Sequence, residues 1–225
     1  LERAGTQDAP QLAAVHGVVA LGCRFRDELE SPRHHAEEAI RIERELGAPF
    51  SLPARLALIN STVFSGAAAP PADVFADSDE YPRNHPDGFY RMNAEAQNAI
   101  MATWLGHHEA AEHLALKALK IARESGNPTS LAYAEWSLGQ AIEHDDPERA
   151  EQLFDDALRL ARDVDNQWVN SLVQVSFASS RRRTSGPVAA AGLLADLLGQ
   201  LRRAGHWAQL WNVTRLVALC AGDVG

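Results

Sequence analysis

The chain has 225 residues, of which 46% are hydrophobic and 23% are charged, a composition typical of a folded protein and not of a disordered tail. Its net charge of −9 would repel a polyanion, so we expect no direct binding to nucleic acid. No apolar run approaches the roughly 18–20 residues of a membrane span, and the first residues do not read as a secretion signal, so we expect a cytoplasmic protein with no membrane contact.

Helical periodicity is strong where the repeat is clearest. The clearest stripe, in 147–164, has apolar residues at i, i+3, i+4, i+7, i+8 and i+11, from Ala150 to Ala161. No stretch alternates in the manner of a strand, which predicts an all-α protein. In chain order, the predicted helices lie near 8–26, 32–46, 52–64, 90–105, 108–125, 129–143, 147–164, 167–182, 187–204 and 207–221.

The predicted helices have matching start and stop signals. A residue that can cap a helix precedes a proline at Ser31, Asp146 and Gly186, which predicts three helix starts. Glycines predict helix ends at 47, 126 and 205. Cys23 and Cys220 lie far apart in apolar helical contexts, so we expect two reduced thiols in the core and no disulfide.

The junctions between helices recur at a nearly constant step. Comparable turn sequences end at Phe50, Phe89, Thr129, Trp168 and Trp207, which are 39, 40, 39 and 39 residues apart. A fixed period of this length indicates stacked helix pairs, each of which needs its neighbours to bury its apolar face. We therefore predict an α-α superhelix of antiparallel helix pairs with 39–40 residues per repeat, forming a single domain over 1–225.

The second pair departs from the pattern at about 70–88. Prolines at 70, 71, 82 and 86 leave room for about two helical turns around 72–80. The shortened element is compatible with a hinge, a lid or a docking site, and equally with ordinary drift in a repeat array.

The alanine-rich second helices carry a resemblance to tetratricopeptide repeats. The A-x3-F-x2-A core of those repeats occurs as Ala150, Phe154 and Ala157, although the step of 39–40 exceeds the usual 34. With the longer step, the arginine-rich composition and the closing segment 201–216, the chain resembles the C-terminal helical-repeat region of actinobacterial signal-transduction ATPases and LuxR- or AfsR-type transcriptional regulators. The resemblance is specific for the fold and much less so for the biological role.

The resemblance implies a non-catalytic sensor or protein-interaction region cut from a longer multidomain chain. Its partner would be a protein or peptide, including a neighbouring ATPase domain of the same chain, with homo-oligomerisation left open. Two alternatives remain, a free-standing scaffold or adaptor of the same fold and, much less favoured, an enzyme with an unrecognised site. The apolar helix at 207–221 lacks a polar cap, so we expect more chain or another molecule to cover it.

Motifs that would carry chemistry are missing. The glycines at 17 and 22 are followed by Cys23 and Arg24 instead of the lysine and hydroxyl of a phosphate-binding loop. In the run from His108 to His113 the second histidine stands at i+5, about 100° further round a helix than a zinc-binding i+4 pair requires. We therefore expect no cofactor and no catalytic or metal site in this segment.

An arginine run and the tryptophans leave two interpretations each. Arg181, Arg182 and Arg183 suit the negative end of a helix dipole, or alternatively bind an anion or acidic peptide. Trp168 and Trp207 follow the repeat and indicate packing between repeats. Trp136 breaks the repeat, which makes it the strongest candidate for an exposed aromatic contact.

A ligand-binding groove is predicted along the first helix of each pair, as in tetratricopeptide arrays. Such a groove holds extended peptides or helices through amide and charged side chains. Aligning the repeats on their alanine core places the candidate groove residues at Asn60, Asn93, Gln97, Glu135, Trp136, Gln174 and Arg181.

Overall fold

The computed structural model describes residues 9–23, 30–46, 88–204 and 207–224, together with several positions between 51 and 61. The described part is helical, with no strand. Its contacts divide the chain into two compact units, Leu1–Tyr81 and Pro82–Gly225. Whether 1–225 behaves as one domain therefore stays a prediction, and each unit is described by itself.

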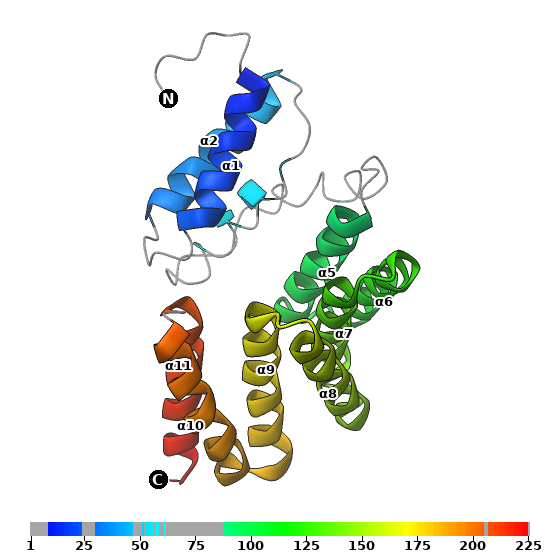
Figure 1. Ribbon diagram of the computed structural model, residues 1–225, viewed down its shortest axis with the longest axis vertical. Coiled ribbons are helices and arrows are strands. Elements are labelled where there is room, and N and C mark those ends of the chain that lie inside the picture. Colours follow the sequence, from blue (N-terminus) through cyan, green and yellow to red (C-terminus); the bar gives the residue numbers. More distant parts are fainter. Residues whose placement is uncertain are drawn as a thin grey trace. The chain divides into compact units, whose positions relative to one another are not determined.

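The first unit pairs α1 (Ala9–Cys23) with α2 (Glu30–Leu46) (Figure 1). Their interface is built from alanines, with Ala20, Ala36 and Ala39 fully buried, so the two backbones approach closely. A buried ion pair joins Arg55 to Glu43 of α2, with Nη1 and Oε2 2.5 Å apart. The predicted start at Ser31 is wrong, because α2 already begins at Glu30.

The second unit stacks helix pairs in sequence order (Figure 1). Its helices, in chain order, are α5 (Gly88–Trp104), α6 (His108–Ser125), α7 (Pro128–Ile142), α8 (Pro147–Asp163), α9 (Gln167–Ser185), α10 (Pro187–Ala204) and α11 (Trp207–Val224). The first helices of successive pairs begin at 88, 128, 167 and 207, steps of 40, 39 and 40 residues. The predicted all-α fold of antiparallel, tetratricopeptide-like pairs is confirmed.

Caps at the predicted positions fix several helix boundaries. Asp146 accepts a hydrogen bond from the Arg149 amide at 3.0 Å, with Pro147 as the first helical residue of α8. Gly126 ends α6 with φ of 64°, a left-handed conformation that glycine adopts without strain. Asn127, which the sequence analysis did not single out, caps α7 by accepting from the amides of Thr129 and Ser130.

The core of the second unit runs without a break from α5 to the first half of α9. The alanines of the predicted stripes on α6 and α8 are buried, from Ala111 to Ala122 and from Ala150 to Ala161, and Phe154 fills the space between α7 and α8. A second cluster joins the end of α9 to α10 and α11 and includes the buried free thiol of Cys220. The stacked pairs therefore present the first helices α5, α7 and α9, here the inner helices, on one side, and α6 and α8, the outer helices, on the other.

The predicted features at Phe50, Gly47, Gly205 and 70–87 lie outside the described residues, as does most of the predicted helix at 52–64. Within the described part, no helix is both long and apolar enough to span a membrane.

Candidate functional site

Side chains of the inner helices hold neighbouring repeats together through hydrogen bonds. Gln97 on α5 donates through Nε2 to the hydroxyl of Tyr133 on α7. On the same pair of helices, Ser137 donates through Oγ to the carbonyl of Ala96 at 3.1 Å. Each contact spans about one repeat of sequence, so these polar groups set the register between adjacent helix pairs.

The next interface repeats this arrangement with different residues. Trp136 Nε1 donates to Ser176 Oγ on α9 at 2.8 Å, and Gln140 Nε2 donates to the same oxygen at 2.6 Å. The Tyr133 ring packs against Trp136, with centroids 5.2 Å apart, and stacks on Trp168 of α9 at 5.6 Å. We call these inner-helix residues the inner face, which comprises Asn93, Gln97, Tyr133, Trp136, Gln140, Trp168, Leu172 and Ser176.

Trp136 is not the exposed contact that the sequence analysis predicted. Only 7% of its surface is accessible, and its indole N–H is already bonded to Ser176. Its departure from the repeat reflects a partner one repeat later in the chain, not a free surface. The exposed aromatic residues of this unit include instead Phe89 and Trp104 at the two ends of α5, which are 44% and 51% accessible.

Glu135 lies on the opposite side of α7 from the inner face. It is separated from Tyr133 by two residues, about 200° round the helix. The charges that act on its carboxyl come from Arg123 on α6 and from Asp156 and Arg159 on α8. Burial, followed by Asp156, raises the pKa of Glu135 to about 7. Its Oε2 is buried without a hydrogen-bond partner.

Arg181 likewise faces an outer helix. Its Nη2 lies 3.1 Å from Glu151 Oε2 on α8, and its guanidinium lies 5.0 Å from the ring centre of Phe177. Gln174 precedes Arg181 by two helical turns, so it lies on the same stripe of α9. The structure therefore places Asn93, Gln97 and Trp136 together on the inner face, and Glu135, Gln174 and Arg181 away from it; Asn60 lies outside the described residues.

The arginine run is engaged within the protein. Arg182 Nη1 lies 2.6 Å from Asp223 Oδ2 on α11, and Arg183 pairs with Glu143 at the end of α7. Together with the ion pair between Arg181 and Glu151, three consecutive arginines at the end of α9 form ion pairs with residues of α8, of α11 and at the end of α7. These ion pairs favour a structural role for the run over the alternative of an external anion.

Sequence reasoning missed Tyr133, Gln140, Leu172 and Ser176 of the inner face, although two of these residues had a usable signal. Ser176 stands 40 residues after Trp136, one repeat on, and Gln140 lies one turn after Trp136 on the same side. Tyr133 had no such signal, because a tyrosine in an apolar helix reads as ordinary core. No group of histidine, cysteine or carboxylate side chains within the described ranges is arranged to hold a metal ion.

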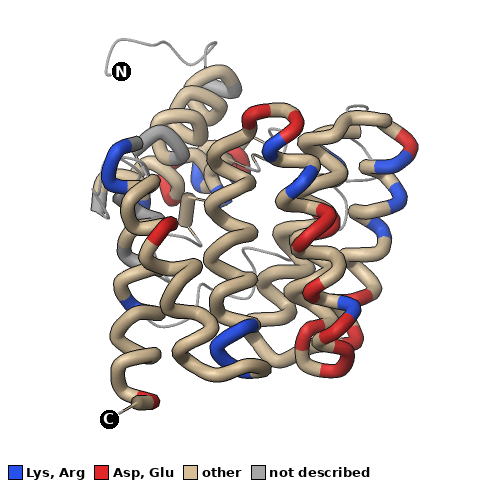
Figure 2. The backbone as a smooth tube through the Cα atoms, turned by 60° about the horizontal axis from the view of Figure 1, so that its bottom comes forward, with Lys and Arg blue, Asp and Glu red and all other residues tan. Residues whose placement is uncertain are grey.

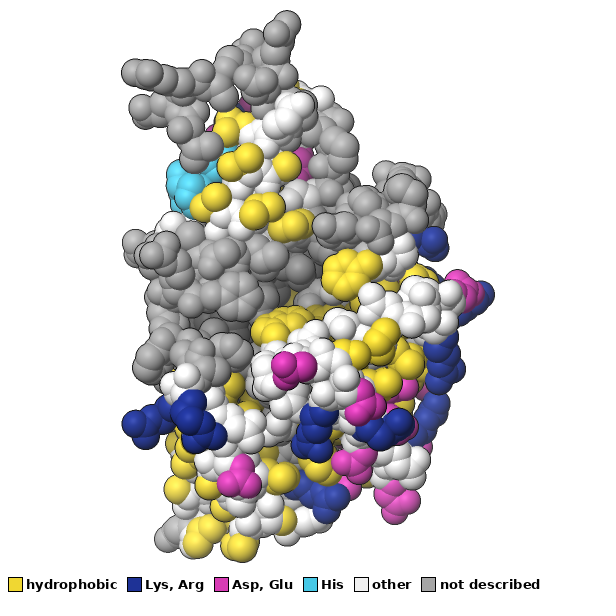
Figure 3. All heavy atoms as spheres, in the orientation of Figure 1, with side chains coloured by type: hydrophobic (Ala, Val, Ile, Leu, Met, Phe, Trp, Pro, Cys, Tyr) yellow, Lys and Arg dark blue, Asp and Glu magenta, His cyan; other side chains and the backbone are white. Residues whose placement is uncertain are grey.

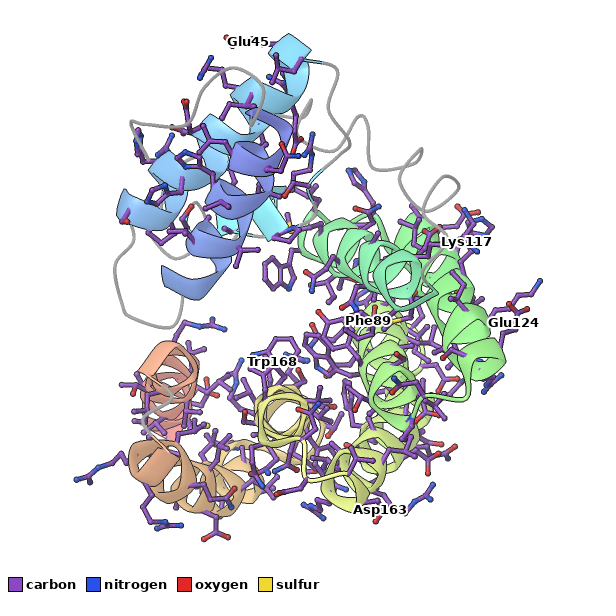
Figure 4. All side chains as sticks on the ribbon, turned by 45° about the horizontal axis from the view of Figure 1, so that its top comes forward. Glu45, Phe89, Lys117, Glu124, Asp163 and Trp168 are labelled. Atoms are coloured by element: carbon purple, nitrogen blue, oxygen red, sulfur yellow. The ribbon has the colours of Figure 1, made fainter. Side chains whose placement is uncertain are left out.

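Charge separates the two sides of the second unit. In Figure 2 acidic and basic residues concentrate on the side that carries α6 and α8, and α8 alone has eight of them among its 17 residues. Figure 3 shows hydrophobic atoms over α5 and near the upper end of α9, and charged side chains along the right-hand edge and over the lower part of this unit. Phe89 and Trp168 lie on the inner side in Figure 4, whereas Lys117, Glu124 and Asp163 lie at the outer edge.

Stacked antiparallel pairs with this period define a tetratricopeptide-like helical array. No protein-family model and no curated protein matches the sequence. Among solved structures, it is similar to a signal-transduction ATPase with numerous domains and a tetratricopeptide-repeat sensor from Pyrococcus horikoshii, at a TM-score of 0.56 and 12% identity. The alignment covers 93% of this chain but 36% of the archaeal one, so the likeness concerns the fold.

Proposed function

We propose that this chain is the non-catalytic sensor and protein-interaction segment of a cytoplasmic multidomain signalling or transcriptional regulator, of the kind that joins helical repeats to an ATPase in LuxR- and AfsR-type proteins. The single observation that carries the proposal is the inner face. Three stacked helices are held in fixed register by aromatic and amide side chains, of which Gln97, Gln140 and Trp168 stay partly exposed, while the charged residues gather on the outer helices. Such a surface suits the docking of a protein or peptide.

The solved structure to which the chain is similar supports the multidomain setting. In that protein a tetratricopeptide-repeat sensor belongs to a signal-transduction ATPase with numerous domains. By analogy, the array would alternate between packing on an ATPase domain of its own chain and binding a partner through the inner face. A ligand shifts such an equilibrium only if it binds one of the two arrangements more tightly.

The proposal is tested first by reading the native reading frame on both sides of this segment, which we expect to encode a nucleotide-binding domain. We then expect the rate of ATP hydrolysis by that purified domain to change when this segment is added to it. The substitution Trp104→Asp on the inner side of α5 should weaken that effect, whereas Lys117→Asp on α6 should not. A frame without a nucleotide-binding domain would contradict the regulator and favour the free-standing scaffold.

A further inference from the structure

Among the described residues of α5, α7 and α9, no charged side chain lies on the inner face. On α5 the charged residues are Arg91 and Glu95, which lie about 120–160° round the helix from Gln97. On α7 the one charged residue is Glu135, which is buried toward α6 and α8. On α9, residues 167–180 contain none, and the arginines that follow pair with other helices.

The polar atoms of the inner face are largely engaged already. The amide of Gln97 donates to the Tyr133 hydroxyl, and the indole N–H of Trp136 and the amide of Gln140 both donate to the Ser176 hydroxyl. Ser176 in turn donates to the carbonyl of Leu172 at 3.3 Å. A partner that presented charges here would lose hydration without gaining a counter-charge, which costs several kcal/mol per buried ion.

What the face offers instead is the aromatic area at its edges, because Tyr133 and Trp136 themselves are buried. Along α5, Phe89 and Trp104 lie on the same helix side as Asn93 and Gln97. Phe89 and Trp104, both substantially exposed, mark its ends and are separated by 15 residues, or about 22 Å of helix. Trp168 on α9, which is half-buried and stacks on Tyr133, adds a further aromatic side chain. Large aromatic side chains contribute most of the binding energy of protein interfaces.

We propose that the inner face binds an uncharged protein segment rich in aliphatic and aromatic side chains, and that it discriminates against acidic and basic segments. This inference rests on the proposed function and names the chemistry of its partner. Binding is driven by burial of apolar surface, so it responds little to ionic strength. Discrimination arises because a charged partner residue stays unpaired on this face.

The test is a selection of random peptides of about twelve residues on the full chain, followed by affinity measurements on the enriched sequences. We expect apolar, uncharged peptides whose Kd changes less than about twofold between about 50 and about 500 mM NaCl. Trp104→Asp places a charge at the edge of the inner face and should weaken binding by about tenfold or more. Lys117→Asp, a change at an exposed position on α6, should leave Kd within about twofold.

The outcomes separate the partner chemistry from the proposed function. Enriched peptides that are acidic or basic, bind in a salt-dependent way and still lose affinity in Trp104→Asp would overturn the partner chemistry and leave an interaction surface in place. An absence of enrichment, or enrichment indifferent to Trp104→Asp, would overturn both. Circular dichroism of each variant confirms that the fold is retained, and Trp104→Ala provides a milder change at the same position.

Discussion

The buried carboxyl of Glu135 gives the second unit a pH-dependent stability. Because its folded-state pKa is raised to about 7, the folded protein holds the proton more tightly than the unfolded chain. Ionising Glu135 in the folded protein therefore costs stability. This cost is absent at low pH, grows as pH rises above about 4.3, the pKa of a glutamate in the unfolded chain, and is complete above about pH 7. A shift of this size corresponds to at most about 4 kcal/mol, since each pKa unit is worth about 1.4 kcal/mol.

We therefore predict that Glu135→Gln stabilises the protein at about pH 8 and has little effect near pH 4.5, as measured by urea unfolding. The amide keeps the shape of the side chain and does not ionise. Asp145→Asn, at an exposed loop position, is the matched control and should show no such pH dependence. An equal effect of Glu135→Gln at both pH values would contradict the prediction.

In the first unit, a histidine pair makes stability depend on pH in the opposite direction, so that stability falls as pH is lowered. His16 Nδ1 on α1 and His35 Nδ1 on α2 are 2.8 Å apart, so one ring donates to the other when a single proton is shared. Burial, and then His35, lower the pKa of His16, with His34 acting in the same direction and Glu38 opposing it. A histidine with a lowered folded-state pKa stabilises the fold above the unfolded value of about 6.5 and loses that contribution as pH falls.

Amide hydrogen exchange of α1 should consequently show weaker protection at about pH 5 than at about pH 7.5, after correction for intrinsic rates. His16→Asn retains a polar group near the Nδ1 position without titrating, so it should flatten this dependence. His113→Asn, an exposed histidine on α6, serves as the control and should leave it unchanged. A parallel pH dependence in wild type and His16→Asn would rule out the pair as its source.

At the scale of helices, the close contact between α7 and α8 depends on a glycine, Gly139, which has no side chain to separate the two helices. A Cβ placed on Gly139 would lie 2.6 Å from Cε1 of Phe154, whose ring is fully buried in the core. Gly139→Ala gains up to about 1 kcal/mol of helix propensity. The overpacking costs about 1–3 kcal/mol, so we predict net destabilisation in urea unfolding.

Gly192 provides the matched control, because a Cβ there meets nothing within 4 Å in the middle of α10. Gly192→Ala should therefore stabilise the protein by up to about 1 kcal/mol. Combining Gly139→Ala with Phe154→Leu should recover part of the loss, since the smaller side chain leaves room for the methyl group. Equal effects of the two glycine substitutions would contradict the packing argument.

The sequence predicted where most helices begin and end, but it did not predict which side of each inner helix faces its neighbours. Caps such as Asp146 and the alanine stripes of α6 and α8 act locally, so they mark the outer helices and their ends. The side of α7 that faces a neighbour depends on residues one repeat away, such as Gln97 and Ser176. Aligning the alanine cores fixed the period but left Glu135 and Arg181 on the wrong side of their helices for an inner face.

At the scale of the molecule, the second unit has a core of its own. Its main cluster extends from Met92 to Val173, and each described helix packs chiefly on its neighbours in the chain. In repeat proteins of this kind, stability is approximately a sum of repeat and interface terms, so a set of adjacent repeats can fold alone. The contacts divide the chain near residue 81, within the segment 70–88 where the sequence departs from the repeat.

We predict that the segment 82–225, expressed alone, folds and unfolds cooperatively, and that its amide NMR signals match those of the same residues in the full chain. A shorter segment, 108–225, lacks α5 and therefore loses Met92, Ile100 and the contacts of Gln97 and Ala96 with α7. It should be less stable by several kcal/mol, because α7 then exposes the apolar surface that α5 covers. Widespread signal changes in 82–225 would show that the second unit depends on residues 1–81, as a single domain over 1–225 requires.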